Sequence, residues 1–159
     1  MVLVLQLFLQ SINKWGEHRM IIEQLVTSFI ASAAFVIIFN VPKRLLLNCG
    51  LVGMIGWLIY ILFVEYDFDS VLATFVAAFF VAIISQLFAR WYKTPVTIFS
   101  VSGIIPLVPG GLAYEAMRHV VLNDYSMAIQ LAAKAFMISG AIAIGLVFSE
   151  VINQIIKRA

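Results

Sequence analysis

Five long runs without a charged residue divide this chain of 159 residues, at 24–42, 45–64, 71–89, 94–114 and 135–149. A helix needs about 20 mostly apolar residues to cross the hydrocarbon core of a bilayer. Each run reaches this length, or nearly so once its flanks are added. Strands of a membrane barrel would alternate apolar and polar residues over about ten positions, whereas these runs are apolar on every face. The pattern predicts an all-α, polytopic membrane bundle of about five transmembrane helices.

Composition excludes several classes of protein. Hydrophobic residues make up 64% of the chain and charged residues 11%, against about half and a quarter in soluble domains. The net charge of +2 includes no basic stripe for nucleic acid. Cys49, His18 and His119 lie far apart in the sequence, so we expect no metal and no cofactor. Sequence motifs of nucleophilic catalysis or phosphate binding are absent, and we expect no enzyme.

Charged residues predict the orientation. Lys and Arg flank the runs at three places: Lys43 and Arg44, Arg90 and Lys93, and Lys157 and Arg158. The connection between the second and third runs instead carries Glu65, Asp67 and Asp69. Because Lys and Arg concentrate on the cytoplasmic side, the basic sites, including the C-terminus, are expected in the cytoplasm. The part after Lys93 must then cross twice, which gives five spans and an N-terminus outside.

The predicted transmembrane domain covers residues 20–159, with spans at about 21–41, 45–64, 71–90, 96–117 and 127–153. Residues 1–19 form an extension that lacks the basic start and cleavage site of a signal peptide. It is either a helix lying in the membrane interface or the product of a start assigned too early, with Met20 as the true one.

The fourth span contains the most informative element, with Pro106, Pro109, Gly110 and Gly111 inside six residues. Each proline removes a backbone donor and clashes with the preceding turn, and the glycines permit unusual dihedral angles. We therefore expect a discontinuous helix, whose second half begins near Gly110 or Gly111. Such helices bind substrates near the midplane of transporters, and a helix N-terminus suits a carboxylate. A proline kink or a tight turn outside the membrane is the alternative.

Small residues predict close helix packing. Gly50, Gly53 and Gly56 share roughly one face of the second span, and Ala141 and Gly145 form a pair in the last. Faces of this kind let helix backbones approach one another in lipid.

A few polar residues need separate interpretations. Lys134 either extends to the membrane interface or pairs with a substrate carboxylate or an acidic partner. Asn40 is expected to cap the first span before Pro42. A contact with Asn153 and exposure at the interface would explain Glu150. The roles of Glu23 and Gln86 stay open.

The motifs together resemble a known family. Asn40-Val41-Pro42 ends the first span, and Pro106-Leu107-Val108-Pro109-Gly110 breaks the fourth, with Tyr114 shortly after. Over about residues 20–154 the chain resembles the small subunit of the threonine/serine exporter family.

The resemblance implies a secondary transporter of the bacterial cytoplasmic membrane that couples efflux to the proton motive force. In split members a five-span small subunit works with a larger subunit, and some members export small organic acids such as dicarboxylates. We expect a homo- or hetero-oligomer, because midplane sites form between two repeats and five spans make only one half. The candidate substrate-binding residues are Asn40, Pro106, Pro109, Gly110, Gly111, Tyr114 and Lys134. A non-transporting membrane scaffold is the alternative from another functional class.

Overall fold

The computed structural model describes residues 21–39 and 41–158, and every regular element within these ranges is a helix. A first helix spans Ile21–Ile38. The elements that follow are η1 (Lys43–Leu45), α2 (Leu46–Glu65), α3 (Ser70–Tyr92), α4 (Val96–Ile104), η2 (Ile105–Leu107), α5 (Gly110–Val121) and α6 (Tyr125–Arg158). Four helices in this part of the chain are long and apolar enough to cross a membrane, or five if the bent pair of Val96–Leu107 and Gly110–Val121 is one span. The predicted all-α membrane bundle with a broken fourth span is confirmed.

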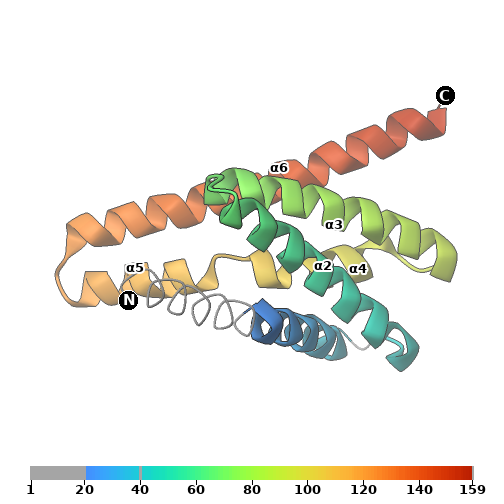
Figure 1. The fold of residues 1–159 in the computed structure, drawn as a ribbon, viewed down its shortest axis with the longest axis horizontal. Helices are drawn as coiled ribbons and strands as arrows, with labels where there is room; N and C mark the ends of the chain where they lie inside the picture. The colour runs from blue at the N-terminus through green and yellow to red at the C-terminus, as the bar shows by residue number, and fades with distance from the viewer. Residues whose placement is uncertain (1–20, 40, 159) are drawn as a thin grey trace, which may run out of the picture.

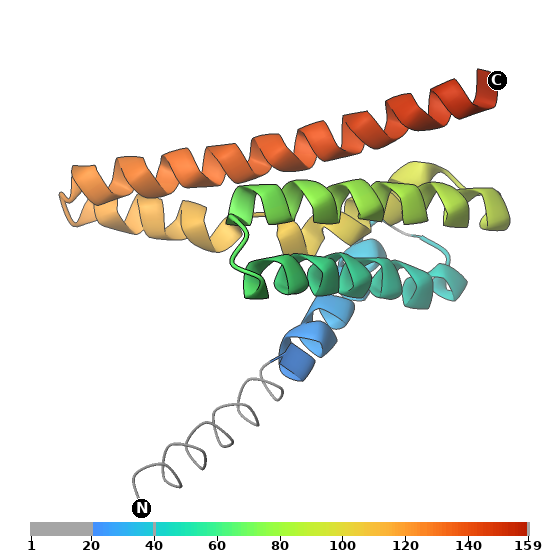
Figure 2. The same cartoon turned by 45° about the horizontal axis from the view of Figure 1, so that its top comes forward.

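The helices form a bundle with a long hairpin at one end (Figure 1). α2 and α3 are antiparallel neighbours, and α4 packs against both. α6 lies along α3, while α5 packs against the first half of α6 (Figure 2). In both views the α5–α6 hairpin continues well past the turn that joins α2 to α3.

Glycine lets α2, α3 and α4 come close together around a shared core. Val52, Val81 and Phe99 are fully buried, one on each helix. A Cβ atom on Gly56 would lie 2.5 Å from Cγ2 of Val81, and one on Gly103 would lie 2.7 Å from Cγ1 of Val52. Larger side chains at either position would force the helices apart, which confirms the expected packing role of this face of α2.

A second close approach joins α6 to α3. A Cβ atom on Gly145 would lie 2.8 Å from the carbonyl oxygen of Phe75. A Cβ atom on Gly140, little more than one turn earlier, would meet nothing within 4 Å. Gly145 is therefore the point at which α6 is pressed against the backbone of α3.

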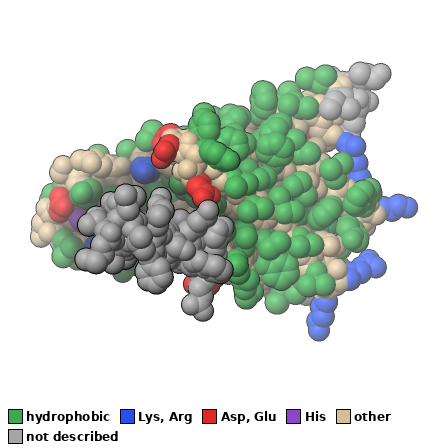
Figure 3. Space-filling model, viewed as in Figure 1, with side chains coloured by type: hydrophobic (Ala, Val, Ile, Leu, Met, Phe, Trp, Pro, Cys, Tyr) green, Lys and Arg blue, Asp and Glu red, His purple; other side chains and the backbone are tan. Residues whose placement is uncertain are grey.

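Charge is distributed unevenly along the bundle. Most of the Lys and Arg side chains visible in Figure 3 project from one end, and apolar side chains cover the middle. The turn at the other end of α2 and α3 carries Glu65, Asp67 and Asp69. We call these the basic end and the acidic end of the bundle.

Candidate functional site

The fourth span is broken at a single extended residue. α4 continues into η2, which contains Pro106, and Val108 then adopts φ −64° and ψ 128°. Pro109 caps α5, which begins at Gly110 as the sequence predicts, and the two halves meet at a bend of 49°. Neither Gly110 nor Gly111 has a positive φ. The prolines alone account for the break, and the conformational freedom of the glycines is not used.

The end of the first half-helix leaves a carbonyl group without its helical donor. Pro106 has no N–H to donate to the carbonyl of Ser102 four residues earlier. One turn later the N–H of Val108 donates to the carbonyl of Ile105 at 3.3 Å, which closes the 3-10 turn.

The first amides of the second half-helix have no acceptor within that helix. Its first helical bond runs from the N–H of Ala113 to the carbonyl of Pro109 at 3.1 Å. The amides of Gly111 and Leu112 precede that bond and have no acceptor one turn back in the helix. The N-terminus of α5 therefore offers polarised donors beside the break.

A cavity of about 210 Å³ lies against the break. Its walls come from α2, α3, the broken span and α6. The lining residues are Trp57, Tyr60, Thr74, Pro106, Leu107, Val108, Pro109, Gly111, Leu112 and Ile138. Known pockets for drug-sized ligands measure about 300–1,000 Å³, so this cavity suits a smaller molecule.

Trp57 gives this cavity a polar donor that the sequence analysis missed. Its indole Nε1 is buried and has no hydrogen-bond partner among the described residues. The ring contacts that of Tyr60, with centroids 5.0 Å apart and the planes tilted by 30°. A buried Trp N–H normally finds an acceptor. Trp57 lines both this cavity and a neighbouring one of about 380 Å³ that Gln24 and Glu65 also border, so its indole N–H is a donor available at the junction of the two. No local pattern could have revealed it, because Trp57 lies in a run that is apolar on every side.

The break lies beside the middle of α2 and the first third of α3. A Cβ atom on Gly53, the eighth residue of α2, would lie 3.5 Å from Cγ of Pro106, and Thr74 in the cavity wall is four residues from the start of α3. The rise of about 18 Å along Val96–Leu107 is close to half of a hydrocarbon core of about 30 Å. The expected position near the midplane stays a prediction.

The structure brings together only some of the predicted site residues. Pro106, Pro109 and Gly111 line the cavity at the break. Gly110 and Tyr114 are exposed and are not part of that lining.

The other two predicted residues lie apart from the break. Lys134 is exposed, with no ion pair to another described residue, one turn of α6 before the lining residue Ile138. Asn40 lies outside the described residues.

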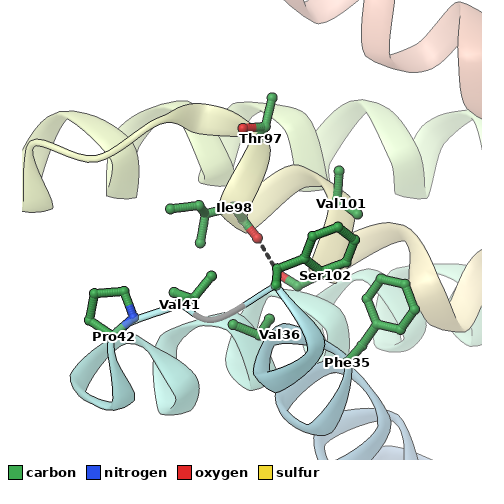
Figure 4. A pocket seen from close by; sticks show the side chains of 9 residues that line it. Phe35, Val36, Val41, Pro42, Thr97, Ile98, Val101 and Ser102 are labelled. Atoms are coloured by element: carbon green, nitrogen blue, oxygen red, sulfur yellow. Dashed lines mark hydrogen bonds between the residues drawn. The ribbon is translucent and has the colours of Figure 1, made fainter.

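The residues around position 40 border a second cavity, of about 340 Å³ (Figure 4). Phe35 and Val36 of the first helix and Val41 and Pro42 after it face Ile98, Val101 and Ser102 of α4. The hydroxyl of Ser102 donates to the carbonyl of Ile98 at 2.9 Å. Most of the residues that line this cavity are apolar, and the hydroxyl of Ser102 is already bonded to the backbone of its own helix.

Polar residues also meet between α3 and α6, near the basic end. The side-chain amide of Gln86 donates to the hydroxyl of Ser149 and to the carboxylate of Glu150, both at 3.3 Å. Arg90 donates to the side-chain oxygen of Asn153. The expected contact between Glu150 and Asn153 is wrong, because Gln86 reaches the carboxylate from α3 and Asn153 serves Arg90 instead.

A search of residues 21–39 and 41–158 for three or more His, Cys, Asp or Glu side chains that could hold a metal finds no such group. The donors at the break are backbone amides and an indole, which suit an anion and not a metal ion.

Comparison with known proteins identifies the family. The family model described as threonine/serine exporter, ThrE, matches residues 24–152. No solved structure matches the chain. The matched segment contains the break, its cavity and most of the polar residues between α3 and α6, and the family is one of transporters. Because the match covers well over half of the chain, this multi-pass membrane protein belongs to the threonine/serine exporter family.

Proposed function

We propose that the chain is a membrane subunit of a secondary transporter that exports small amino acids such as threonine and serine. The observation that carries the proposal is the broken fourth span beside a small cavity with a vacant indole donor. The substrate carboxylate accepts hydrogen bonds from the α5 amides and from Trp57.

The lining of the cavity supports this class of substrate. A carboxylate is an acceptor-only group, and the indole N–H is donor-only, so the two are complementary. Tyr60 and Thr74 line the same cavity. The hydroxyl of Thr74 donates to the carbonyl of Ser70 at 2.7 Å, so the hydroxyl oxygens of both residues could serve as acceptors for an ammonium group. Leu107, Leu112 and Ile138 supply apolar contact for a short side chain.

We propose that a larger subunit with a matching transmembrane half completes the site. On α5 only Ala116 is buried. Tyr114, Met117 and Val121 on that helix are 67%, 65% and 78% exposed. In a membrane protein such apolar surface is covered either by lipid or by another protein. The larger subunit would cover it here, because the hairpin extends beyond α2 and α3 and α5 also carries Arg118 and His119, which suit lipid poorly. Association of the two chains would enclose the cavity on the side that α5 leaves open.

The proposed location is the bacterial cytoplasmic membrane, with the basic end in the cytoplasm. The N-terminus would then lie outside and the C-terminus inside. The gathering of Lys and Arg at one end supports this orientation.

The test is efflux of labelled threonine, serine and a dicarboxylate from cells without native exporters. The chain is expressed alone and together with its larger partner. Export of threonine or serine that requires both chains supports the proposal. Export of the dicarboxylate alone would change the substrate class, and no export of any of the three, despite insertion of both chains, would contradict the proposal.

A double substitution tests the role of the break. Pro106→Ala with Pro109→Ala should abolish export while the protein still inserts, because a continuous helix has no free amides at the site. Pro95→Ala, at the start of α4, is the control and should leave export intact. Normal export by the double variant would separate transport from the broken helix.

A further inference from the structure

Glu150 differs from the other paired acidic residues in the nature of its partners. Glu115 forms an ion pair with Arg118 at 3.0 Å, and Asp124 lies 3.1 Å from His119. Glu150 instead meets two amides, of Gln86 at 3.3 Å and of Gln154 at 3.4 Å. It lies within the segment Tyr125–Ile155, which is apolar enough to span a membrane. An ionisable residue in such a segment marks an ion path or a proton relay more often than it serves packing.

The partners of Glu150 can accommodate both of its protonation states. An amide side chain carries a donor and an acceptor. Gln86 donates to the carboxylate through Nε2, and after rotation its carbonyl oxygen could accept a hydrogen bond from the carboxylic acid. The hydroxyl of Ser149, which shares the same Nε2 group, has the same dual capacity. An Arg or Lys partner could satisfy only the carboxylate.

The charged groups near Glu150 come from three helices. α6 packs against α3 and α5. From α3 the charged group is Arg90, which donates to Asn153, and the charged residues of α5 are Glu115, Arg118 and His119, near the other end of α6. On α6 itself Lys134 is more than four turns earlier, and Lys157 and Arg158 are about two turns later, with side chains outside the described part of the chain. Among the described side chains no ion pair includes Glu150.

Protons can also reach the carboxyl group of Glu150. Glu150 is exposed, whereas Gln86, Ser149 and Asn153 are buried. A cavity of about 190 Å³ lies beside the cluster, lined by Gln86, Arg90, Ser149 and Asn153 together with apolar residues. Glu150 is not among the lining residues of this cavity, and its carboxyl group is connected to it through Gln86, at 3.3 Å.

We propose that Glu150 binds and releases a proton during the export cycle, with Gln86 as its partner in both states. The proposal rests on the proposed transport function and adds the site of ion coupling to it. The site is separate from the break, so substrate and proton would occupy different parts of the chain.

The test uses the full chain in liposomes, together with the larger subunit if activity requires it. A threonine gradient is applied, and both internal pH and threonine–threonine exchange are measured. Glu150→Gln should reduce threonine-driven proton movement by on the order of a hundredfold, a typical effect of removing a proton-transferring group. Exchange, which needs no net proton transfer, should persist. Glu150→Asp should retain proton movement, and Glu115→Gln is the matched control that should behave as the wild type.

Undiminished proton movement in Glu150→Gln would overturn the proposal. Loss of both proton movement and exchange in Glu150→Gln and in Glu150→Asp would assign the residue to packing and overturn it equally. The infrared carboxylic-acid band of the bilayer-embedded protein gives a readout independent of transport. The other seven Asp and Glu side chains also contribute to this band, so the comparison is between wild type and variant. A component that appears on acidification in the wild type and is missing in Glu150→Gln supports the site, and identical spectra contradict it. A wild type that exchanges no threonine would instead refute the proposed function.

Discussion

The α2–α3–α4 core and the α5–α6 hairpin differ in how many side chains they bury and in how closely their helices approach. In the core, Val52, Val81 and Phe99 are fully buried, and glycines allow the helices to approach closely. In the hairpin, α5 buries Ala116 alone, and a Cβ atom on Gly110, Gly111 or Gly140 would meet nothing within 4 Å. The three core helices share fully buried side chains, whereas α5 leaves most of its side chains exposed among the described residues.

The boundary between the two regions is the break itself. Pro106 lies beside Gly53 of the core, 3.5 Å from where its Cβ would be, and α5 begins three residues after η2 ends. A site at such a boundary combines the closely packed wall of the core with the more exposed wall of α5. Substitutions on each side should therefore affect different properties.

The largest effect is expected where α6 touches the backbone of α3. Gly145→Ala should lower the free energy of unfolding by about 1–3 kcal/mol, because the carbonyl of Phe75 cannot move aside as a side chain could. Gly140→Ala is the control, since both changes gain the same helix propensity of about 1 kcal/mol and only one creates a clash. Thermal unfolding in detergent measures the difference, and equal stability of the two variants would show that this approach is not tight.

A smaller effect, on transport, is expected from removing the indole N–H of Trp57. Trp57→Phe keeps an aromatic ring and removes the N–H, so export should fall about 10- to 100-fold, in line with the 1.5–3 kcal/mol of a hydrogen bond to a charged group. The control is Trp91→Phe, whose side chain is 77% exposed at the other end of α3. If the two variants export threonine equally well, Trp57 does not bind the substrate.

The hairpin surface should matter for association and not for folding. Val121→Ser should weaken co-purification of the larger subunit by about fivefold, the change expected from losing one interface contact of about 1 kcal/mol. Val147→Ser changes a valine that is 62% exposed on the part of α6 beside the core and should leave the complex intact. A loss of association in both variants would place the interface elsewhere.

The smallest effect is expected at the ion pair of the hairpin. Glu115→Gln breaks its contact with Arg118, and both side chains are at least 40% exposed. The free energy of unfolding should change by less than about 0.5 kcal/mol, as for other exposed pairs one turn apart on a helix. A larger loss in thermal unfolding would mean that the hairpin is held more tightly than its exposure indicates.

The sequence predicted the helical class and the position of the break because each depends on local chemistry. Uncharged runs specify spans, and Pro106 and Pro109 remove backbone donors wherever they occur. Trp57 and the pairing of Gln86 with Glu150 could not be predicted. Each depends on how far one apolar helix is rotated against another, and spans that are apolar on every face carry no mark of that rotation.

α6 is a single uninterrupted helix, and its close contact with α3 divides it into a long part and a short part. Its close contact with α3 at Gly145 is a natural fulcrum. From Tyr125 to that point the arm is about 30 Å long, and from there to Glu150 it is about 7.5 Å, at 1.5 Å per residue. If α6 tilts as a rigid rod, a displacement of about 4 Å at the hairpin tip becomes about 1 Å at the carboxylate, in the opposite direction. Such a rigid helix would couple a movement of α5 to the position of Glu150 without any flexible loop between them.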